Sequence, residues 1–121
     1  MNNTNIVLNI LKKSSKNFTA YEILDKFQKI RKTQPMTVYR ALNDLIKKGE
    51  IHKSNQSKTY LLCNQDNHKK HNPSIAICKK CGDTKELKSD LFSNILKNYR
   101  LKKYDFSNFE IEVSTLCRGC L

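Results

Sequence analysis

Apolar residues recur at helical spacing in three stretches of the first half of the chain, which predicts three short helices. The first helix is expected over residues 4–13. Thr19 and Glu22 form a capping-box pattern at the start of the second helix. Pro35 opens the third helix and Gly49 ends it. The predicted buried positions, in chain order, are Ile6, Val7, Ile10, Leu11, Ile23, Leu24, Phe27, Ile30, Val38, Leu42, Leu45 and Ile46.

Two short apolar runs follow the third helix. Residues 51–54 and 59–63 are predicted strands, and the polar residues 55–58 join them into a hairpin. A hairpin placed directly after three helices forms the wing of a winged helix-turn-helix domain. We therefore assign residues 1–63 to such a domain.

The second half predicts a smaller α+β unit. Residues 64–73 are polar throughout and are predicted to be a hinge. Strands are expected at 74–78 and 84–87, and the alternating segment 109–113 is expected to be a strand with one face in water. Between them Ser89 is predicted to cap a helix. The apolar side of that helix comprises Leu91, Phe92, Ile95, Leu96 and Tyr99. A small unit over residues 74–121 with an exposed sheet edge favours dimerisation.

Two cysteine pairs have the CxxC spacing of metal-binding turns. They are Cys78-Lys79-Lys80-Cys81 and Cys117-Arg118-Gly119-Cys120. Four thiolates from two such turns form the tetrahedral shell of a structural Zn²⁺ site. Redox dithiols or two disulfides are the alternatives. A chain with 38% hydrophobic residues and no tryptophan has a thin core, so a zinc staple for residues 74–121 is the favoured interpretation.

Positive charge is concentrated in the first half. The net charge is +12, of which residues 1–63 contribute 12 basic minus 4 acidic residues (+8) and residues 64–121 contribute 11 minus 7 (+4). This excess favours a nucleic acid partner, although a lysine-rich solvated surface explains part of it. No run is apolar enough to span a membrane and no signal peptide is recognisable, so we expect a cytoplasmic protein with reduced thiols.

The third predicted helix has a polar face suited to reading DNA. Arg40 lies opposite the apolar stripe, flanked by Met36, Thr37, Asn43 and Lys47. The recognition helix of a helix-turn-helix presents such residues to the major groove. The alternative is a basic face that only contacts water.

A second metal site is suggested by residues outside the cysteine pairs. His52 lies on the first wing strand, Cys63 ends the second, His71 lies in the hinge, and Glu86 follows the first CxxC turn. Two imidazoles, a thiolate and a carboxylate suit Zn²⁺ better than Fe²⁺ or Mn²⁺. Each residue also has an ordinary explanation: a buried thiol, a hydrogen-bonded core histidine or a solvated carboxylate. His68 is more simply a solvent-exposed residue than a ligand.

Five motifs, in this order and spacing, resemble the ferric uptake regulator superfamily, and within it the zinc uptake regulators. The resemblance covers nearly the whole chain. The motifs are Met36-Thr37-Val38-Tyr39-Arg40-Ala41-Leu42, Gly49-Glu50-Ile51-His52-Lys53, Tyr60-Leu61-Leu62-Cys63, Cys78-Lys79-Lys80-Cys81-Gly82 and Cys117-Arg118-Gly119-Cys120.

The resemblance implies a winged-helix domain hinged to a zinc-stapled α/β dimerisation domain, and two Zn²⁺ ions per chain. It implies a regulatory zinc site at His52, Cys63, His71 and Glu86, and a structural site at the four paired cysteines. DNA contacts are implied for Tyr21 and Arg40. To these the recognition-helix prediction adds Thr37, Tyr39, Asn43 and Lys47.

The implied function is a zinc-responsive repressor that binds palindromic operator DNA as a homodimer and controls zinc uptake genes. Iron and peroxide sensors of the superfamily carry a His-x-His that is replaced here by Pro73 and Ile75, and a histidine that is replaced by Asn17-Phe18. An iron-, manganese- or peroxide-responsive regulator is one alternative. A zinc-containing nucleic-acid-binding protein without a sensing role is another. No nucleophile–base pair or phosphate loop suggests an enzyme or a small-molecule substrate.

Overall fold

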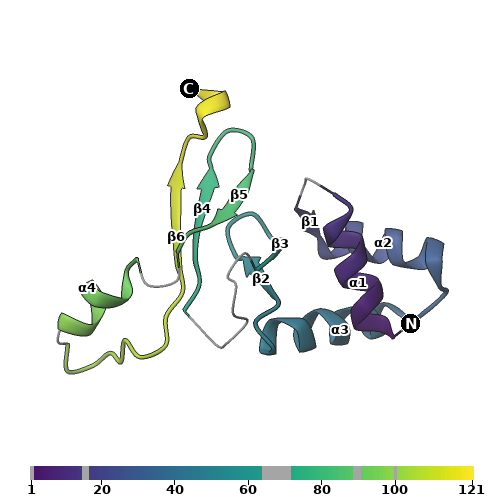
Figure 1. Cartoon of the computed structure of the whole chain (residues 1–121), viewed down its shortest axis with the longest axis horizontal. Coiled ribbons are helices and arrows are strands. Elements are labelled where there is room, and N and C mark those ends of the chain that lie inside the picture. The colour runs from purple at the N-terminus through teal and green to yellow at the C-terminus, as the bar shows by residue number, and fades with distance from the viewer. Residues whose placement is uncertain (1, 15–16, 64–71, 89–90, 100) are drawn as a thin grey trace.

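The computed structural model describes residues 2–14, 17–63, 72–88, 91–99 and 101–121 (Figure 1). Most of the predicted hinge 64–73 lies outside the described residues, and so do His68, His71 and Ser89. Figure 1 shows helices α1 (Asn3–Lys12), α2 (Ala20–Ile30) and α3 (Pro35–Lys47) at one end of the molecule and α4 (Ser93–Asn98) at the other, and the strands between residues 51 and 115 lie between them.

The three predicted helices are confirmed as α1 (Asn3–Lys12), α2 (Ala20–Ile30) and α3 (Pro35–Lys47). Thr19 and Glu22 form the expected capping box at the start of α2. Pro35 stands in the first turn of α3. After α3, Gly49 has a φ of 75°. The Gly49 N–H donates a hydrogen bond to Ile46 O at 3.0 Å, and the Glu50 N–H donates one to Leu45 O at 3.0 Å. This pair of bonds is a Schellman motif, which explains why a glycine ends the helix.

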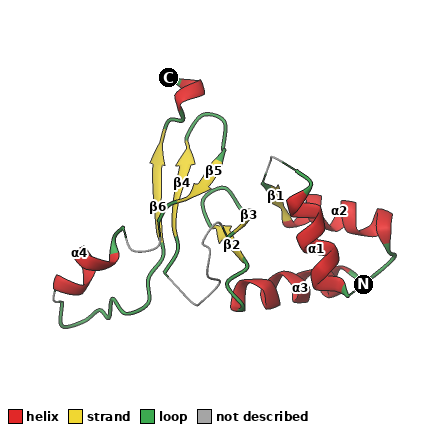
Figure 2. Ribbon diagram, viewed as in Figure 1, coloured by secondary structure: helices red, strands yellow, loops and turns green. Residues whose placement is uncertain are grey.

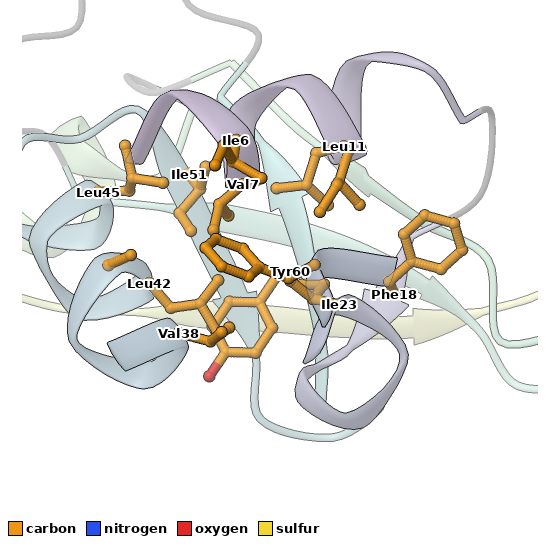
Figure 3. Close-up of a cluster of buried hydrophobic side chains, with 13 residues drawn as sticks. Ile6, Val7, Leu11, Phe18, Ile23, Val38, Leu42, Leu45, Ile51 and Tyr60 are labelled. Carbon is orange, nitrogen blue, oxygen red and sulfur yellow. The ribbon is translucent and has the colours of Figure 1, made fainter. Parts of the chain in front are cut away.

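One core joins the three helices to the wing hairpin. Phe27, Ile23, Leu42 and Leu45 are fully buried in it, and Tyr60 from the hairpin reaches the same cluster (Figure 3). The predicted apolar stripes are confirmed except at one position. Ile30, the last residue of α2, is 61% exposed, because the helix ends beyond the edge of the core.

Phe27 therefore supports a stability test with a control on the same helix. Phe27→Ala should lower the free energy of unfolding by about 3–5 kcal/mol, because it removes a fully buried ring. Ile30→Ala should change it by less than about 0.5 kcal/mol, because its side chain already contacts water. Urea denaturation of both variants measures the difference. Equal losses would contradict the placement of the core.

The hairpin strands, β2 (Ile51–Ser54) and β3 (Thr59–Leu62), are confirmed, and together we call them the wing. A short strand that the sequence did not predict, β1 (Phe18–Thr19), pairs antiparallel with β3 to give the sheet order β1-β3-β2. Two residues are too few to leave a periodic signal in the sequence. β1 ties the start of α2 to the wing.

The second sheet has the order β5-β4-β6, with β4 (Ser74–Cys78) antiparallel to β5 (Thr84–Glu86) and parallel to β6 (Ile111–Thr115) (Figure 2). The prediction of a strand at 109–113 was wrong by two residues. Parallel pairing with β4 begins at Ile111 opposite Ser74, so Phe109 and Glu110 precede the strand.

The last helix, α4 (Ser93–Asn98), is shorter than predicted. Leu91 and Phe92 precede it, so the predicted helix over these two residues was wrong. None of its residues is buried. Its predicted apolar side faces solvent in the single chain, with Leu91 52%, Ile95 66% and Tyr99 58% exposed.

The wing and the second sheet face each other. Leu61 of β3 and Ile75 and Ile77 of β4 form a small buried cluster separate from the main core. This contact joins α1–α3 and the wing, which we call the helical unit, to the second sheet.

Candidate metal centres and DNA-binding face

The four paired cysteines converge at one end of the second sheet. Cys78 ends β4, and the parallel register sets it opposite Thr115 of β6, just before Cys117. The Lys79 N–H donates to Thr115 O at 2.8 Å and joins the two turns. The ligand atoms of all four cysteines lie within 4.8 Å of one another. The sheet thus brings the two CxxC turns together although they are far apart in sequence.

The sulfur spacing fits a tetrahedral zinc ion. The Sγ atoms of Cys81 and Cys117 are 3.8 Å apart. A Zn–S bond of about 2.3 Å places tetrahedral sulfurs about 3.8 Å from one another. A disulfide requires about 2.0 Å between sulfurs, and none of the described cysteines forms one. The geometry therefore favours a metal shell over disulfides.

Hydrogen bonds within this cluster shift the pKa values of two of its thiols in opposite directions. Bonds from the backbone at Cys117 and Cys81 lower the pKa of the Cys78 thiol to about 6. Hydrogen bonds to Cys117 and Cys78 raise the pKa of the Cys120 thiol to about 12. A bound cation stabilises the fully deprotonated set, which is the form that ligates zinc.

A second cluster lies where the wing meets β5. His52 of β2, Cys63 just after β3 and Glu86 at the end of β5 have ligand atoms within 4.8 Å of one another. His52 Nε2 is 2.8 Å from Glu86 Oε2, with side chains only 8% and 1% exposed. The Cys63 N–H donates to Glu50 O at 2.9 Å, which fixes the chain beside His52.

This cluster has the donor set expected for zinc. It offers one imidazole nitrogen, one thiol and one carboxylate, all buried. Carboxylates this deeply buried are rarely left without a cation or a strong hydrogen bond. The fourth candidate, His71, lies outside the described residues.

The predicted DNA-contacting residues lie mostly on exposed parts of α2 and α3. Tyr21, at the start of α2, is 80% exposed. Arg40, Asn43 and Lys47 are exposed on one side of α3, and Thr37 and Tyr39 are half-buried. Arg40 and Thr37 also line a groove between α3 and the N-terminal residues of α1. Arg40, Asn43 and Lys47 thus give α3 an exposed polar side, whereas Tyr39 packs against the main core.

Two contacts between the helical unit and the second sheet escaped the sequence prediction. Asn17 Nδ2 donates to Thr84 O at 3.2 Å and also to Thr84 Oγ1. Glu112 of β6 accepts hydrogen bonds from the turn of the wing. Neither residue belongs to a motif, and both partners are distant in sequence. These contacts become visible only when the structure brings the distant segments together.

The described part of the chain contains no helix that is long and apolar enough to cross a membrane. A winged-helix fold with an exposed basic helix and two metal-type clusters defines a class of metal-dependent DNA-binding regulators. The chain belongs to the ferric uptake regulator family, whose model matches residues 2–115.

Three proteins that are similar to this chain are zinc uptake regulators or structures of them. The chain is 29% identical over 117 residues to the zinc uptake regulation protein of Escherichia coli, covering 95% of this chain and 68% of that protein. It resembles the structure of a zinc uptake regulator complexed with zinc and DNA, with a TM-score of 0.80, 26% identity and coverage of 99% and 81% of the two chains. It resembles holo XcZur with a TM-score of 0.83, 28% identity and coverage of 99% and 84%.

Proposed function

We propose that this protein is a zinc-responsive transcriptional repressor that binds palindromic operator DNA as a dimer and controls zinc uptake genes. The observation that carries the proposal is the buried His52, Cys63 and Glu86 cluster between the wing and β5. Its nitrogen, sulfur and oxygen donors suit Zn²⁺ better than the oxygen-preferring Mn²⁺. The similarity to zinc uptake regulators supports the same assignment.

The proposal includes two Zn²⁺ ions per chain. One is structural and is bound by Cys78, Cys81, Cys117 and Cys120. The other is regulatory and is bound by His52, Cys63, His71 and Glu86. When bound, the regulatory ion cross-links the wing to the second sheet.

The chain's own residues explain how this cross-link affects DNA binding. His52 and Cys63 belong to the wing region, and the wing shares its core with α3 through Ile51 and Tyr60. Glu86 belongs to the second sheet. Fixing His52 and Cys63 relative to Glu86 therefore fixes the direction of α3 relative to that sheet. We accordingly propose domains at 1–63 and 74–121, joined by a hinge at 64–73.

Dimerisation through the second half supplies the second recognition helix. The apolar side chains around α4 and the segment after it are exposed in the single chain, and a second copy would cover them. They include Ile95, Tyr99, Leu101 and Tyr104. Two copies with fixed directions of α3 match half-sites about one helical turn, or roughly 34–36 Å, apart. With operator DNA as its partner, the protein is expected to act in the cytoplasm.

On the DNA side, Arg40 and its neighbours on α3 read base edges, while Tyr21 and Lys47 contact the backbone or adjacent bases. Arg40→Ala should lower affinity for the specific operator by about 1–3 kcal/mol with little change in salt dependence, because a base contact is lost. Lys47→Ala should weaken binding to all sequences and reduce the salt slope. Titrations of specific and random duplexes at several salt concentrations measure both. An equal loss for Arg40→Ala on random DNA would make Arg40 a phosphate contact.

Metal-dependent binding tests the proposal as a whole. The protein, freed of regulatory metal, should bind a palindromic duplex only weakly, and added Zn²⁺ should raise the affinity by roughly 5–150-fold. Binding that ignores zinc would contradict the sensing role. A larger effect of Fe²⁺ or Mn²⁺ would favour another sensor of the same family.

A further inference from the structure

Two glutamates of the second sheet lie in one row that faces the wing. Glu86 of β5 and Glu112 of β6 both pair with Ile75 of the central strand β4. Residues directly opposite one another on neighbouring strands share a face of the sheet. Ile75 packs with Leu61 of the wing, so the two carboxylates flank an apolar contact between the sheets.

The wing presents a matching pair of side chains. His52 and Ser54 are two residues apart on β2 and therefore lie on the same face of that strand. His52 contacts Glu86 at 2.8 Å, and Ser54 Oγ donates to Glu112 Oε1 at 2.6 Å. Ser54 is completely buried. The two carboxylates that make these contacts lie on opposite sides of Ile75.

Ser54 is not the only residue of the wing that donates a hydrogen bond to Glu112. Residues 55–58 form the turn of the wing, and two of its backbone groups point at this carboxylate. Asn55 N donates to Glu112 Oε2 at 3.2 Å, and Gln56 N donates to Oε1 at 3.3 Å. Ser114 Oγ of β6 donates to the Gln56 side chain at 2.7 Å. Bonds to an ionised carboxylate are about twice as strong as neutral ones.

We propose that Glu112 is a positioning residue that anchors the turn of the wing to β6, so that the regulatory site and Glu112 together fix the direction of the DNA-binding unit. This rests on the proposed function. The contacts of His52 with Glu86 and of Asn17 with Thr84 both attach the helical unit to β5. Glu112 attaches the turn of the wing to β6, on the other side of the central strand β4, and this attachment needs no metal.

The first test uses amide hydrogen exchange, in the absence of DNA, to ask whether Glu112 holds the turn of the wing. In the zinc-loaded dimer, Glu112→Ala should raise amide hydrogen exchange at Asn55 and Gln56 at least about tenfold, because their acceptor is gone. Glu112→Gln, which keeps one acceptor oxygen, should give a smaller rise. Glu110→Ala is the matched control, because Glu110 has one 3.4 Å contact to Asn55 Nδ2. Unchanged exchange in Glu112→Ala, with protected α3 amides showing an intact fold, would overturn the anchor.

The second test asks whether Glu112 affects DNA binding, by comparing the affinities for a full duplex and for a half-site. A duplex is selected from a random pool by the zinc-loaded wild-type protein, and its half-site is prepared separately. Glu112→Ala should keep two zinc ions per chain and the wild-type half-site affinity, yet lose about tenfold in affinity for the full duplex. The half-site needs one recognition helix, whereas the full duplex needs two in fixed directions.

Equal affinity losses for the half-site and the full duplex, or no loss for either, would overturn the positioning role. If the wild-type protein selects no duplex, the proposed function fails, and the amide exchange still decides whether Glu112 anchors the wing.

Discussion

Cys117→Ser is expected to unfold the second sheet and abolish the dimer. Its sulfur lies 3.8 Å from that of Cys81, and loss of one of four thiolates opens the shell. A structural zinc ion contributes about 10–16 kcal/mol of apparent free energy in zinc-finger peptides. That is comparable with the entire stability of a small domain, about 5–15 kcal/mol. Zinc analysis, circular dichroism and sedimentation measure the three consequences together.

Arg118→Ser provides the matched control for this variant. Arg118 lies in the same turn and is exposed, and it offers no metal ligand. It should leave the zinc content, the fold and the dimer unchanged. A stable Cys117→Ser dimer with wild-type zinc content would show that the four cysteines are not a structural metal site.

Cys63→Ala is expected to have the second largest effect, and it should be purely regulatory. The variant should lose one zinc ion per chain while the fold and the dimer remain. Its affinity for operator DNA should no longer respond to added zinc, a loss of roughly 5–150-fold relative to the zinc-loaded wild type. Removal of the thiol leaves His52 and Glu86 without the sulfur donor of the buried cluster.

Leu62→Ala separates loss of a ligand from loss of packing. Leu62 is a neighbouring, partly buried residue that packs against the main core. Its truncation should lower stability but leave the zinc content and the zinc response intact. If Cys63→Ala retained both zinc ions, the regulatory site would have to be assigned to other residues.

Local signals in the sequence account for the parts of the fold that were predicted. The capping box at Thr19, Pro35 at the start of α3 and Gly49 after it act within a few residues, so they are readable without the rest of the chain. The CxxC spacing is equally local.

The missed features depend on contacts between distant segments. β6 begins at Ile111 because parallel pairing with β4 fixes its register, and alternation in the sequence cannot show this. Ile30 continues a helical stripe but lies beyond the core. For the second cluster the sequence offered suitable residue types, whereas the proximity of His52, Cys63 and Glu86 depends on how the wing faces β5. The contacts of Glu112 have no sequence signal, because its partners lie on the wing, more than 50 residues away in the chain.

Zinc titration of DNA binding tests the central claim most directly. The wild-type dimer, holding only its structural zinc, is titrated with Zn²⁺ in the presence of a palindromic duplex, with Mn²⁺ in a parallel series and Cys63→Ala beside both. We expect affinity for the duplex to rise as one further zinc ion per chain is bound, with a weaker response to Mn²⁺ and none in Cys63→Ala. High affinity before the second zinc ion binds, or an undiminished response in Cys63→Ala, would contradict the account.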